Sequence, residues 1–491
     1  MIYHSTRDEK LTAAPTRAVL EGIAPDGGLY VCDPGKLDFD WQGTLQKDTM
    51  SMAADILGVL LPDFQDMNGL VRASYAGKFA SDDLTPLVPV GERYVLELYH
   101  GPTSAFKDVA LSVLPRLVSA AAKQEGAGDV VILTATSGDT GKAALEGFKN
   151  VDKTKILVFY PVDGVSPMQK LQMTTQEGEN VAVCAIHGNF DDAQSAVKSI
   201  FTNDEIKAEL AKKNMMFSSA NSINWGRLVP QIVYYFSAYA DLCKMGQLQV
   251  GEPMNVVVPT GNFGNILAGY YAKHMGLPIK TMVCASNTNN VLTDFLKTGT
   301  YDRNRDFYAT TSPSMDILIS SNLERLLYHM SGESDAAVRG WMTQLAENGK
   351  YTVEPEVMAK IQNEFAAGYC DEAAVADTIH KTYTNQNYLC DTHTAVAVKV
   401  YRDYVAQTGD DLPTVIDSTA SPYKFSKSVL TAVLEGNTPQ LDEFDMVEEL
   451  HRVTGAAVPA PLAALKDKAV RFTQVCDREN MSQMVFQLLN L

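Results

Sequence analysis

One lysine in this sequence, Lys107, lies where an amine could act as a nucleophile. The stretch around it, residues 100–111, reads HGPTSAFKDVAL. Residues 94–99 are rich in β-branched and aromatic side chains and predict a short strand, which the following Gly-Pro ends. The Thr103-Ser104 pair can then cap a helix whose first turn contains Lys107. Free backbone N–H groups and the positive end of the helix dipole disfavour an ammonium ion there, so we expect a lowered pKa, as a Schiff-base lysine requires.

A lysine in this position also has a simpler interpretation. With Asp108 beside it, Lys107 could be a solvated surface residue, which is the commoner situation for a lysine. The reactive interpretation therefore depends on what surrounds it.

Four polar segments follow directly on predicted strands. They are rich in Gly, Ser, Thr and Asn and comprise residues 136–141, 218–224, 260–265 and 418–421. In an open α/β sheet the carboxyl ends of the strands face the ligand crevice, so we expect these segments to line one site.

Three of these segments could bind anions. Residues 261–265 open a predicted helix with two glycines, so that backbone N–H groups could approach a phosphate; the alternative is an ordinary strand-to-helix turn. Asn221, Ser222 and Arg227 offer amide, hydroxyl and guanidinium donors, unless they form a capped loop with a surface arginine. Residues 136–141 could wrap a carboxylate or form a tight turn.

Two common nucleotide signatures fail. Thr136 replaces the first glycine of a P-loop and Ala143 replaces its Ser or Thr. The glycines at 261, 264 and 269 lack the G-x-G-x-x-G spacing of a dinucleotide fingerprint. We find no spacing typical of metal ligands. His100, His187 and His393 have no partner at a supporting spacing and are interpreted as structural.

Composition restricts the possible partners. The 491 residues are 46% hydrophobic and 20% charged, which predicts a globular chain of two or more domains. A net charge of −18 argues against nucleic acid and anionic membranes as partners. Seven isolated cysteines indicate reduced thiols, and no apolar run is long enough to span a bilayer. We therefore expect a soluble, cytoplasmic protein.

Strand and helix patterns alternate through the middle of the chain. Short apolar runs predict strands at residues 94–99, 130–133, 156–159, 181–183, 256–258, 282–283 and 415–416. Helix-length stretches lie between some of them, at residues 191–210, 226–245 and 265–275. This alternation predicts an α/β fold with a largely parallel sheet covered on both faces. We expect a module at 1–80, an α/β region at 81–435 and a helical tail at 436–491.

Ordered motifs along nearly the whole chain resemble one family. They are YHSTR (3–7), APDGGLY (24–30), HGPTSAFKD (100–108), LTATSGDTG (133–141), SPMQ (166–169), SANSINWGR (219–227), VPTGNFGN (258–265), DTHTAVA (391–397) and STASPYKF (418–425). This set resembles the threonine synthases, pyridoxal-phosphate (PLP) enzymes of the tryptophan-synthase-β-like fold type II, in their longer microbial and fungal form. The resemblance implies two α/β lobes behind an N-terminal module.

The resemblance also implies a role for each motif residue. Lys107 would form the Schiff base with PLP, and Thr419 would donate its hydroxyl to the pyridine nitrogen. The cofactor phosphate would be held by Gly261, Asn262, Phe263 and Asn265. The substrate would be held by Ser137, Asp139 and Thr140 at its carboxylate and by Asn221, Ser222 and Arg227 at its phosphate. Asp139 stands where many fold relatives have an Asn that contacts the cofactor's 3′ oxygen. An anionic Asp would repel that oxygen and the substrate carboxylate, so Asp139 should be protonated, paired or turned away.

The implied reaction is the last step of threonine biosynthesis. O-phospho-L-homoserine and water would give L-threonine and phosphate by γ-elimination and β-addition of water, with Lys107 moving the protons. Three alternatives remain: a PLP-dependent amino-acid dehydratase, a non-catalytic relative that binds PLP or phosphoamino acids, and a nucleotide-binding protein. The sequence leaves open whether the chain is a monomer or a dimer.

Overall fold

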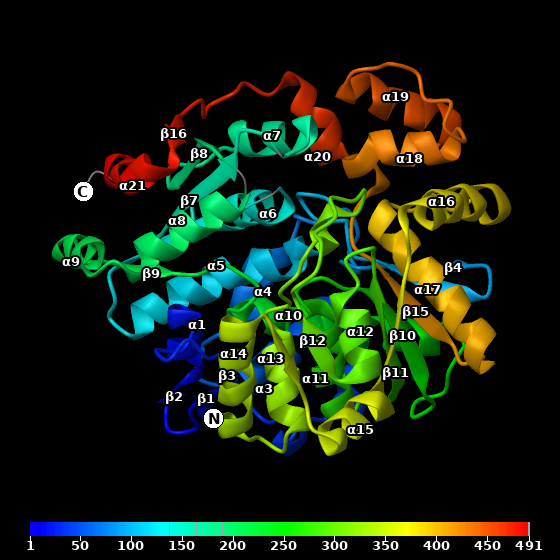
Figure 1. Ribbon diagram of the computed structural model, residues 1–491, viewed down its shortest axis with the longest axis horizontal. Helices are drawn as coiled ribbons and strands as arrows, with labels where there is room; N and C mark the ends of the chain where they lie inside the picture. Colours follow the sequence, from blue (N-terminus) through cyan, green and yellow to red (C-terminus); the bar gives the residue numbers. More distant parts are fainter. Residues whose placement is uncertain (137, 164, 189, 490–491) are drawn as a thin grey trace.

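Two sheets organise the computed structural model, which describes residues 1–136, 138–163, 165–188 and 190–489 (Figure 1). The larger sheet has the strand order β14-β11-β10-β15-β5-β4, in which β4 is antiparallel to β5 and the other pairs are parallel. Its strands are β4 (Leu87–Val90), β5 (Arg93–Glu97), β10 (Met254–Pro259), β11 (Ile279–Ser286), β14 (Phe365–Tyr369) and β15 (Thr414–Ser418).

The second sheet is parallel throughout, in the order β16-β8-β7-β6-β9. Its strands are β6 (Asp129–Ala135), β7 (Thr154–Pro161), β8 (Val181–His187), β9 (Met215–Ser218) and β16 (Val475–Asp477). Every residue of β10 and most residues of β6 to β8 are buried. Strands of this kind need helices over both faces, which explains their continuous apolar runs and confirms the predicted α/β architecture.

Helices cover these sheets and join them. Helix α5 packs on α6 and α10, and α10 packs on α11. The helices of this region are α5 (Lys107–Gln124), α6 (Asp139–Phe148), α7 (Pro167–Thr174), α8 (Phe190–Thr202), α9 (Asp204–Lys212), α10 (Trp225–Lys244), α11 (Gly264–His274), α12 (Val291–Thr298), α13 (Leu323–Met330), α14 (Asp335–Asn348), α15 (Pro355–Glu364), α16 (Glu372–Gln386) and α17 (Thr392–Thr408). A two-stranded ribbon, β12 (Thr300–Asp302) with β13 (Lys350–Thr352), lies among them.

One predicted helix is wrong in extent. The stretch expected as a single helix at 191–210 is divided into α8 and α9. The break falls at Asn203, whose side chain accepts a hydrogen bond from Ile206 N at 3.0 Å and so begins a new helix. The helices expected at 226–245 and 265–275 are α10 and α11, each beginning one residue earlier.

The N-terminal module forms a small antiparallel sheet, β2-β1-β3, followed by helices that pack on α5 and α10. Its elements are β1 (Tyr3–Ser5), β2 (Thr12–Ala13), α1 (Pro15–Glu21), β3 (Tyr30–Val31), η1 (Pro34–Lys36), α2 (Trp41–Thr44), α3 (Thr49–Leu60) and α4 (Met67–Tyr75). Figure 1 shows it in blue, at the far end of the molecule from the C-terminal segments.

The C-terminal segment contains a strand in addition to the expected helices. Strand β16 pairs with β8, with Val475 opposite Ala185. Figure 1 shows the segment in orange and red, from α18 and α19 to β16 and α21. Its elements are η3 (Pro422–Phe425), α18 (Ser426–Val433), α19 (Glu443–Thr454), α20 (Ala460–Ala463), η4 (Ala464–Asp467), η5 (Arg478–Asn480) and α21 (Met481–Leu489). None of the described helices is long and apolar enough to cross a membrane.

Candidate active site

Helix α5 begins at Lys107, which therefore lies in the first helical turn as expected, but the predicted cap is wrong. Phe106 is the N-cap residue and makes no side-chain capping bond. The backbone before it pairs instead with the end of β15, where Phe106 N donates to Thr419 O at 2.8 Å and Ala105 bridges Ala420. This pairing keeps the Thr103-Ser104 pair outside the helix. It also places the lysine directly beside the segment that carries Thr419.

Thr103 is bound by an acid of the first helical turn. Its N–H donates to Asp108 Oδ2 at 2.8 Å and its hydroxyl donates to Oδ1 at 2.5 Å. Burial nevertheless raises the pKa of Asp108 to about 6. These bonds hold the Asp108 carboxyl against the loop that precedes Lys107.

Lys107 has the depressed pKa that amine chemistry needs. Burial is the main cause that lowers the pKa of its amine; Asp139 opposes the shift, the nearby cations Lys424 and Arg227 add to it, and the resulting pKa is about 8. The direction agrees with our expectation, but the main cause is desolvation by the surrounding protein. The side chain remains half-buried, and none of the described residues forms a hydrogen bond or ion pair with its amine.

Thr419 follows β15 and is 6% exposed. Its carbonyl oxygen is used by Phe106 N, whereas its hydroxyl has no hydrogen-bond partner among the described residues. A hydroxyl without a protein partner is free to donate to a ligand.

The 260–265 loop turns sharply from β10 into α11. Phe263, the N-cap residue, has φ +62°, in the left-handed region, and its ring packs in the core 5.8 Å from that of Phe365. A Cβ on Gly261 would lie 2.7 Å from Ser314 O, so glycine is required there. The first N–H groups of a helix have no intrahelical acceptor, and this turn presents them to an anion. Asn262 at the tip is exposed.

The 221–227 segment is built around a buried cation. Arg227 is 3% exposed, donates from Nη1 to Ala220 O at 2.6 Å, and leaves Nε buried without a partner. Burial lowers its pKa to about 10, and no described carboxylate pairs with it. Asn221 Oδ1 accepts from Thr134 Oγ1 at 3.0 Å, and Ser222 is half-buried beside it.

The 136–141 loop presents an ionised acid. Asp139 begins α6, and its Oδ1 lies 2.8 Å from Lys424 Nζ and accepts from Gln169 Nε2 at 3.1 Å. The buried Lys424 holds the pKa of Asp139 well below its usual range, against the effect of burial. Of the three expectations for Asp139, the paired state is therefore observed. Thr140 is half-buried, and Ser137 lies outside the described residues.

Two of the discounted histidines have acidic neighbours. His393 Nδ1 lies 2.7 Å from Asp391 Oδ2, and its Nε2 accepts from Ser314 N at 3.2 Å, which makes it a satisfied structural residue. His100 Nε2 lies 2.7 Å from Glu97 Oε2. Among the described residues, no group of three His, Cys, Asp or Glu side chains could hold a metal ion.

Sequence profiles of three families match the chain in order. They are "Threonine synthase N terminus" at residues 2–87, "Pyridoxal-phosphate dependent enzyme" at 83–368 and "Threonine synthase, C-terminal" at 394–485. Threonine synthase of Saccharomyces cerevisiae is 35% identical over 488 residues, covering 92% of this chain and 93% of that protein. The chain belongs to the threonine synthase family.

Two further comparisons place the chain within that family. A crystal structure of PLP-bound threonine synthase from Brucella melitensis superposes with a TM-score of 0.86 at 38% identity and covers 99% of both chains. This match confirms fold type II. Threonine synthase-like 1 of Pongo abelii is 39% identical over 445 residues, or 87% of this chain. The chain spans 59% of the length of that relative.

The residues around Lys107 fit the cofactor of this PLP-dependent family. The site has an amine of lowered pKa, a hydroxyl without a partner on Thr419, and a helix N-terminus at Gly264. Asn265 adds an amide nitrogen, Nδ2, that is buried without a hydrogen bond. These are the groups that a Schiff-base aldehyde, a pyridine nitrogen and a phosphate would engage.

Several residues that support the candidate site were not predicted from the sequence. Lys424 and Gln169 lie in the STASPYKF and SPMQ motifs, which were recognised without a role for either side chain. Tyr234, Tyr235 and Asp417 lie behind the 260–265 loop and had no sequence signal beyond their helix and strand. Their partners are distant in sequence, so only the fold brings them together.

Proposed function

We propose that this protein is a threonine synthase that converts O-phospho-L-homoserine and water into L-threonine and phosphate. Arg227 is the observation that carries the proposal. A buried guanidinium without a counter-ion costs several kcal/mol, which a bound phosphate dianion would offset. The cation lies close enough to lower the pKa of Lys107, so the phosphate it holds would belong to a molecule that reacts at the lysine.

The two anion-binding segments would hold different phosphates. The 260–265 loop offers neutral donors at a helix N-terminus and suits the cofactor's phosphate ester. The 221–227 segment offers Arg227 with the amide of Asn221 and the hydroxyl of Ser222, and suits the substrate phosphate that leaves. Stabilisation of the departing dianion by Arg227 would lower the barrier to elimination.

Lys107 would carry the proton transfers. PLP, when bound, supplies an electron sink for carbanion chemistry at the substrate. With a pKa of about 8, the lysine amine can accept the Cα proton near neutral pH and return a proton during the later steps. Thr419 would donate its hydroxyl to the pyridine nitrogen and so leave that nitrogen unprotonated.

The carboxylate of the substrate would meet the 136–141 loop. Thr136 Oγ1 already accepts from Gly138 N and Gly141 N, at 3.0 and 2.9 Å, so it rigidifies the turn. We assign the remaining donors, including Thr140, to the carboxylate. Pairing of Asp139 with Lys424 removes the repulsion that a free aspartate would exert on it.

The decisive experiment is phosphate release from O-phospho-L-homoserine, with chiral analysis of the amino-acid product. Threonine synthase activity gives one L-threonine for each phosphate. A dehydratase would instead give a 2-oxo acid and ammonia from a hydroxy-amino acid. A PLP-containing protein that turned over neither substrate would be a binding relative, and the proposal would fail.

We place the reaction in the cytoplasm, on a small-molecule substrate. All seven cysteines are free, including Cys184 and Cys476, whose sulfur atoms are 3.7 Å apart. Unbonded thiols at this distance suit a reducing compartment. Localisation of the tagged full-length chain in its source cells tests this assignment.

A further inference from the structure

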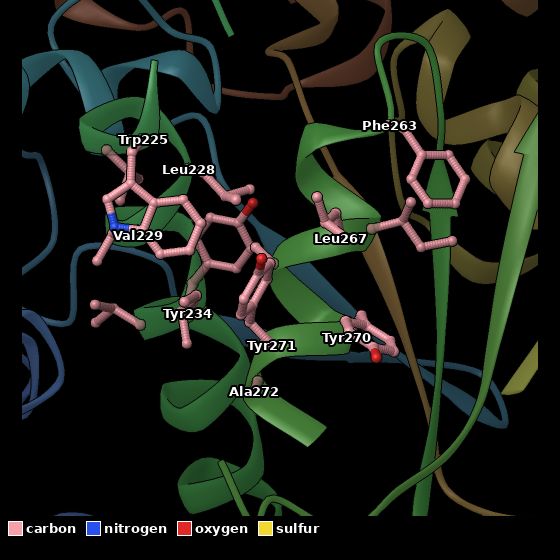
Figure 2. Close-up of a cluster of buried hydrophobic side chains, with 14 of the residues drawn as sticks. Trp225, Leu228, Val229, Tyr234, Phe263, Leu267, Tyr270, Tyr271 and Ala272 are labelled. Atoms are coloured by element: carbon pink, nitrogen blue, oxygen red, sulfur yellow. The ribbon is translucent and has the colours of Figure 1, made fainter. Parts of the chain in front are cut away.

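A closed network of polar groups lies behind the 260–265 loop. Tyr234 and Tyr235 project from α10, Asn265 lies in the first turn of α11, and Asp417 lies in β15, two residues before Thr419. All four are at most 7% exposed, and Asp417 is fully buried. Figure 2 shows α10 and α11 side by side, with Tyr234 on the face of α10 turned toward α11.

The hydrogen bonds of this network do not balance if Asp417 is ionised. Asn265 Oδ1 can only accept, and it is bonded by Tyr234 and, at 2.7 Å, by Tyr235. Each tyrosine has one hydroxyl proton. Tyr234 also has a second, longer acceptor in Gln231 Oε1 at 3.2 Å. The 2.7 Å contact between Tyr235 and Asn265 Oδ1, however, needs the Tyr235 proton, because an amide oxygen cannot donate. Tyr235 Oη also lies 2.9 Å from Asp417 Oδ2. That contact is a hydrogen bond only if the Asp417 carboxyl brings its own proton.

The surroundings of Asp417 favour the protonated form. The titratable groups that face it are the two tyrosines of α10, and α11 contributes a neutral amide. Its neighbour across β5 is Leu96, and no described cation pairs with it. On the opposite face of β15, Ser418 contacts Thr394 at 2.8 Å. Burial raises the pKa of Asp417 to about 7, although Tyr235 and the Asn265 amide oppose the shift.

Ionisation would change what Asn265 can do. A charged Asp417 would accept the hydrogen bond of the Tyr235 hydroxyl and attract the Asn265 amide nitrogen, which has no partner within hydrogen-bond distance but lies near enough to stabilise the charge. A neutral Asp417 no longer attracts the Tyr235 hydroxyl proton or the Asn265 amide nitrogen. An anion bound at the N-terminus of α11 therefore competes with a charged Asp417 for the Asn265 amide and is repelled by its charge. A neutral Asp417 leaves the amide to the anion, so protonation of Asp417 and anion binding favour each other.

We propose that Asp417 is a positioning residue that takes up a proton when the cofactor phosphate binds, and so leaves the Asn265 amide free to hold that phosphate. The inference rests on the proposed function only in assigning the 260–265 loop to PLP. It predicts that PLP affinity is linked to pH through a carboxyl group that contacts neither substrate nor cofactor.

The test compares PLP affinity of the full chain with that of Asp417→Asn, which is neutral at all pH and can donate to Tyr235. At about pH 6 the two affinities should agree within about twofold. At about pH 8.5 the wild-type protein should bind about five- to tenfold more weakly than the variant, because it must then recover a proton. Titration of PLP and Lys107 is common to both proteins and cancels in the ratio.

Two tyrosine variants give matched controls. Tyr235→Phe removes the connection, so its affinity should fall about fivefold or more at low pH. Tyr271→Phe lies on α11 but bonds His329 Nε2 at 2.8 Å, outside the network, and should follow the wild type at both pH values. A ratio of wild-type to Asp417→Asn affinity that does not change with pH would overturn the inference.

Infrared difference spectra give a second readout that does not depend on folding of the aspartate variant. Addition of PLP to the wild-type protein at about pH 8 should produce the carbonyl band of a protonated carboxyl group. The band should be lost or shifted in Tyr235→Phe and kept in Tyr271→Phe. Its absence from the wild-type protein would also overturn the proposal. A chain that bound PLP in this way but made no threonine would refute only the proposed function.

Discussion

The two proposed anion-binding segments share one support, Asn322, whose Nδ2 donates to Ser222 O at 3.1 Å, but their other supports come from different parts of the molecule. The 260–265 loop is braced from within the larger lobe, where Ser320 Oγ donates to Gly261 O at 2.7 Å and Asn322 N donates to Asn262 O at 3.1 Å. Its own residues include no cation. Preorganised neutral donors of this kind suit a ligand that stays bound, because they need no long-range attraction to recapture it.

The 221–227 segment is braced by the N-terminal module. Trp225 Nε1 donates to Tyr3 Oη at 2.8 Å, and Asn224 Nδ2 donates to Val19 O at 3.0 Å. The buried Arg325 donates to Tyr30 O at 2.9 Å and to Ile223 O at 2.6 Å, and so ties the module to the segment.

The difference suggests why one segment has an arginine and the other does not. A substrate dianion must be drawn to a protein of net charge −18 and released after each turnover, which favours a permanent cation held in place. We infer that the N-terminal module maintains the substrate segment and the α10 tyrosines maintain the cofactor loop. The predictions below test this division, from the largest effect to the smallest.

Lys107→Ala removes the amine at which the proposed cofactor and substrate would react. We expect kcat to fall by at least about 10³-fold and the visible absorbance of lysine-bound PLP to disappear. The apo protein should stay folded, because the change removes a half-buried amine that has no ion-pair partner. Circular dichroism and thermal unfolding of the apo forms provide the control. Retained absorbance with normal turnover would move the reactive lysine elsewhere.

Arg227→Met should weaken binding of the substrate phosphate and leave PLP binding unchanged. A charge-assisted pair contributes about 1.5–3 kcal/mol, so kcat/KM for O-phosphohomoserine should fall at least roughly tenfold. PLP content and absorbance should be unchanged, and inorganic phosphate should inhibit the variant less. Loss of PLP before loss of substrate affinity would instead place this arginine at the cofactor.

Lys424→Met tests whether the charge of Lys424 sets the pKa of Lys107. Lys424 lowers the pKa of Lys107, so its removal should raise that pKa above about 8. The amine reacts when neutral, and the rate of PLP capture by the apo protein should therefore rise at a higher pH than in the wild type. A shift of up to about one pH unit corresponds to a tenfold lower rate near neutral pH. An identical pH profile would contradict this coupling, whereas Lys424→Arg should restore most of it.

Thr419→Ala tests the proposed hydrogen bond from Thr419 to the cofactor. Loss of one hydroxyl partner should weaken PLP binding by about 0.5–1.5 kcal/mol and change the absorbance spectrum without removing the lysine bond. Substrate KM at saturating PLP should change much less than in Arg227→Met. Equilibrium dialysis of PLP against both variants makes the comparison, and an unchanged spectrum and affinity would assign the pyridine partner to another group.

A matched pair of tyrosine variants compares the two braces. Tyr3→Phe removes the acceptor of Trp225 Nε1, and Tyr301→Phe removes the acceptor of Ser320 N, a 2.8 Å bond behind the cofactor loop. Each change leaves a buried N–H without its acceptor, which costs about 1–3 kcal/mol, and part of this loss affects ligand binding at the site. We expect Tyr3→Phe to raise substrate KM severalfold at constant PLP affinity, and Tyr301→Phe to do the reverse. Equal effects of both variants on both ligands would remove the proposed division.

Much of the site could be predicted from sequence because its signals are local. Apolar runs locate seven of the eleven strands in the two main sheets, and polar segments directly after strands locate loops at the carboxyl ends of parallel strands. Lys107 was expected in the first turn of a helix and is the first residue of α5. The cap was predicted wrongly because Ser104 to Phe106 pair with residues more than 300 positions away. A contact this distant in sequence cannot be predicted from a local sequence pattern.

Sequence alone thus determined seven strands of the two main sheets with the polar loops that follow some of them, the family, and the types of side chain expected at the site. Tertiary structure decided which charges are compensated. Asp139 is ionised because Lys424 lies 2.8 Å away, and Arg227 is unpaired because no described acid reaches it. Asp417 is fully buried beside Tyr235, so its proton depends on an environment assembled from α10, α11 and β15. The physical reason is that periodicity and turn chemistry act over a few residues, whereas desolvation and ion pairing depend on groups that folding brings together from the whole chain.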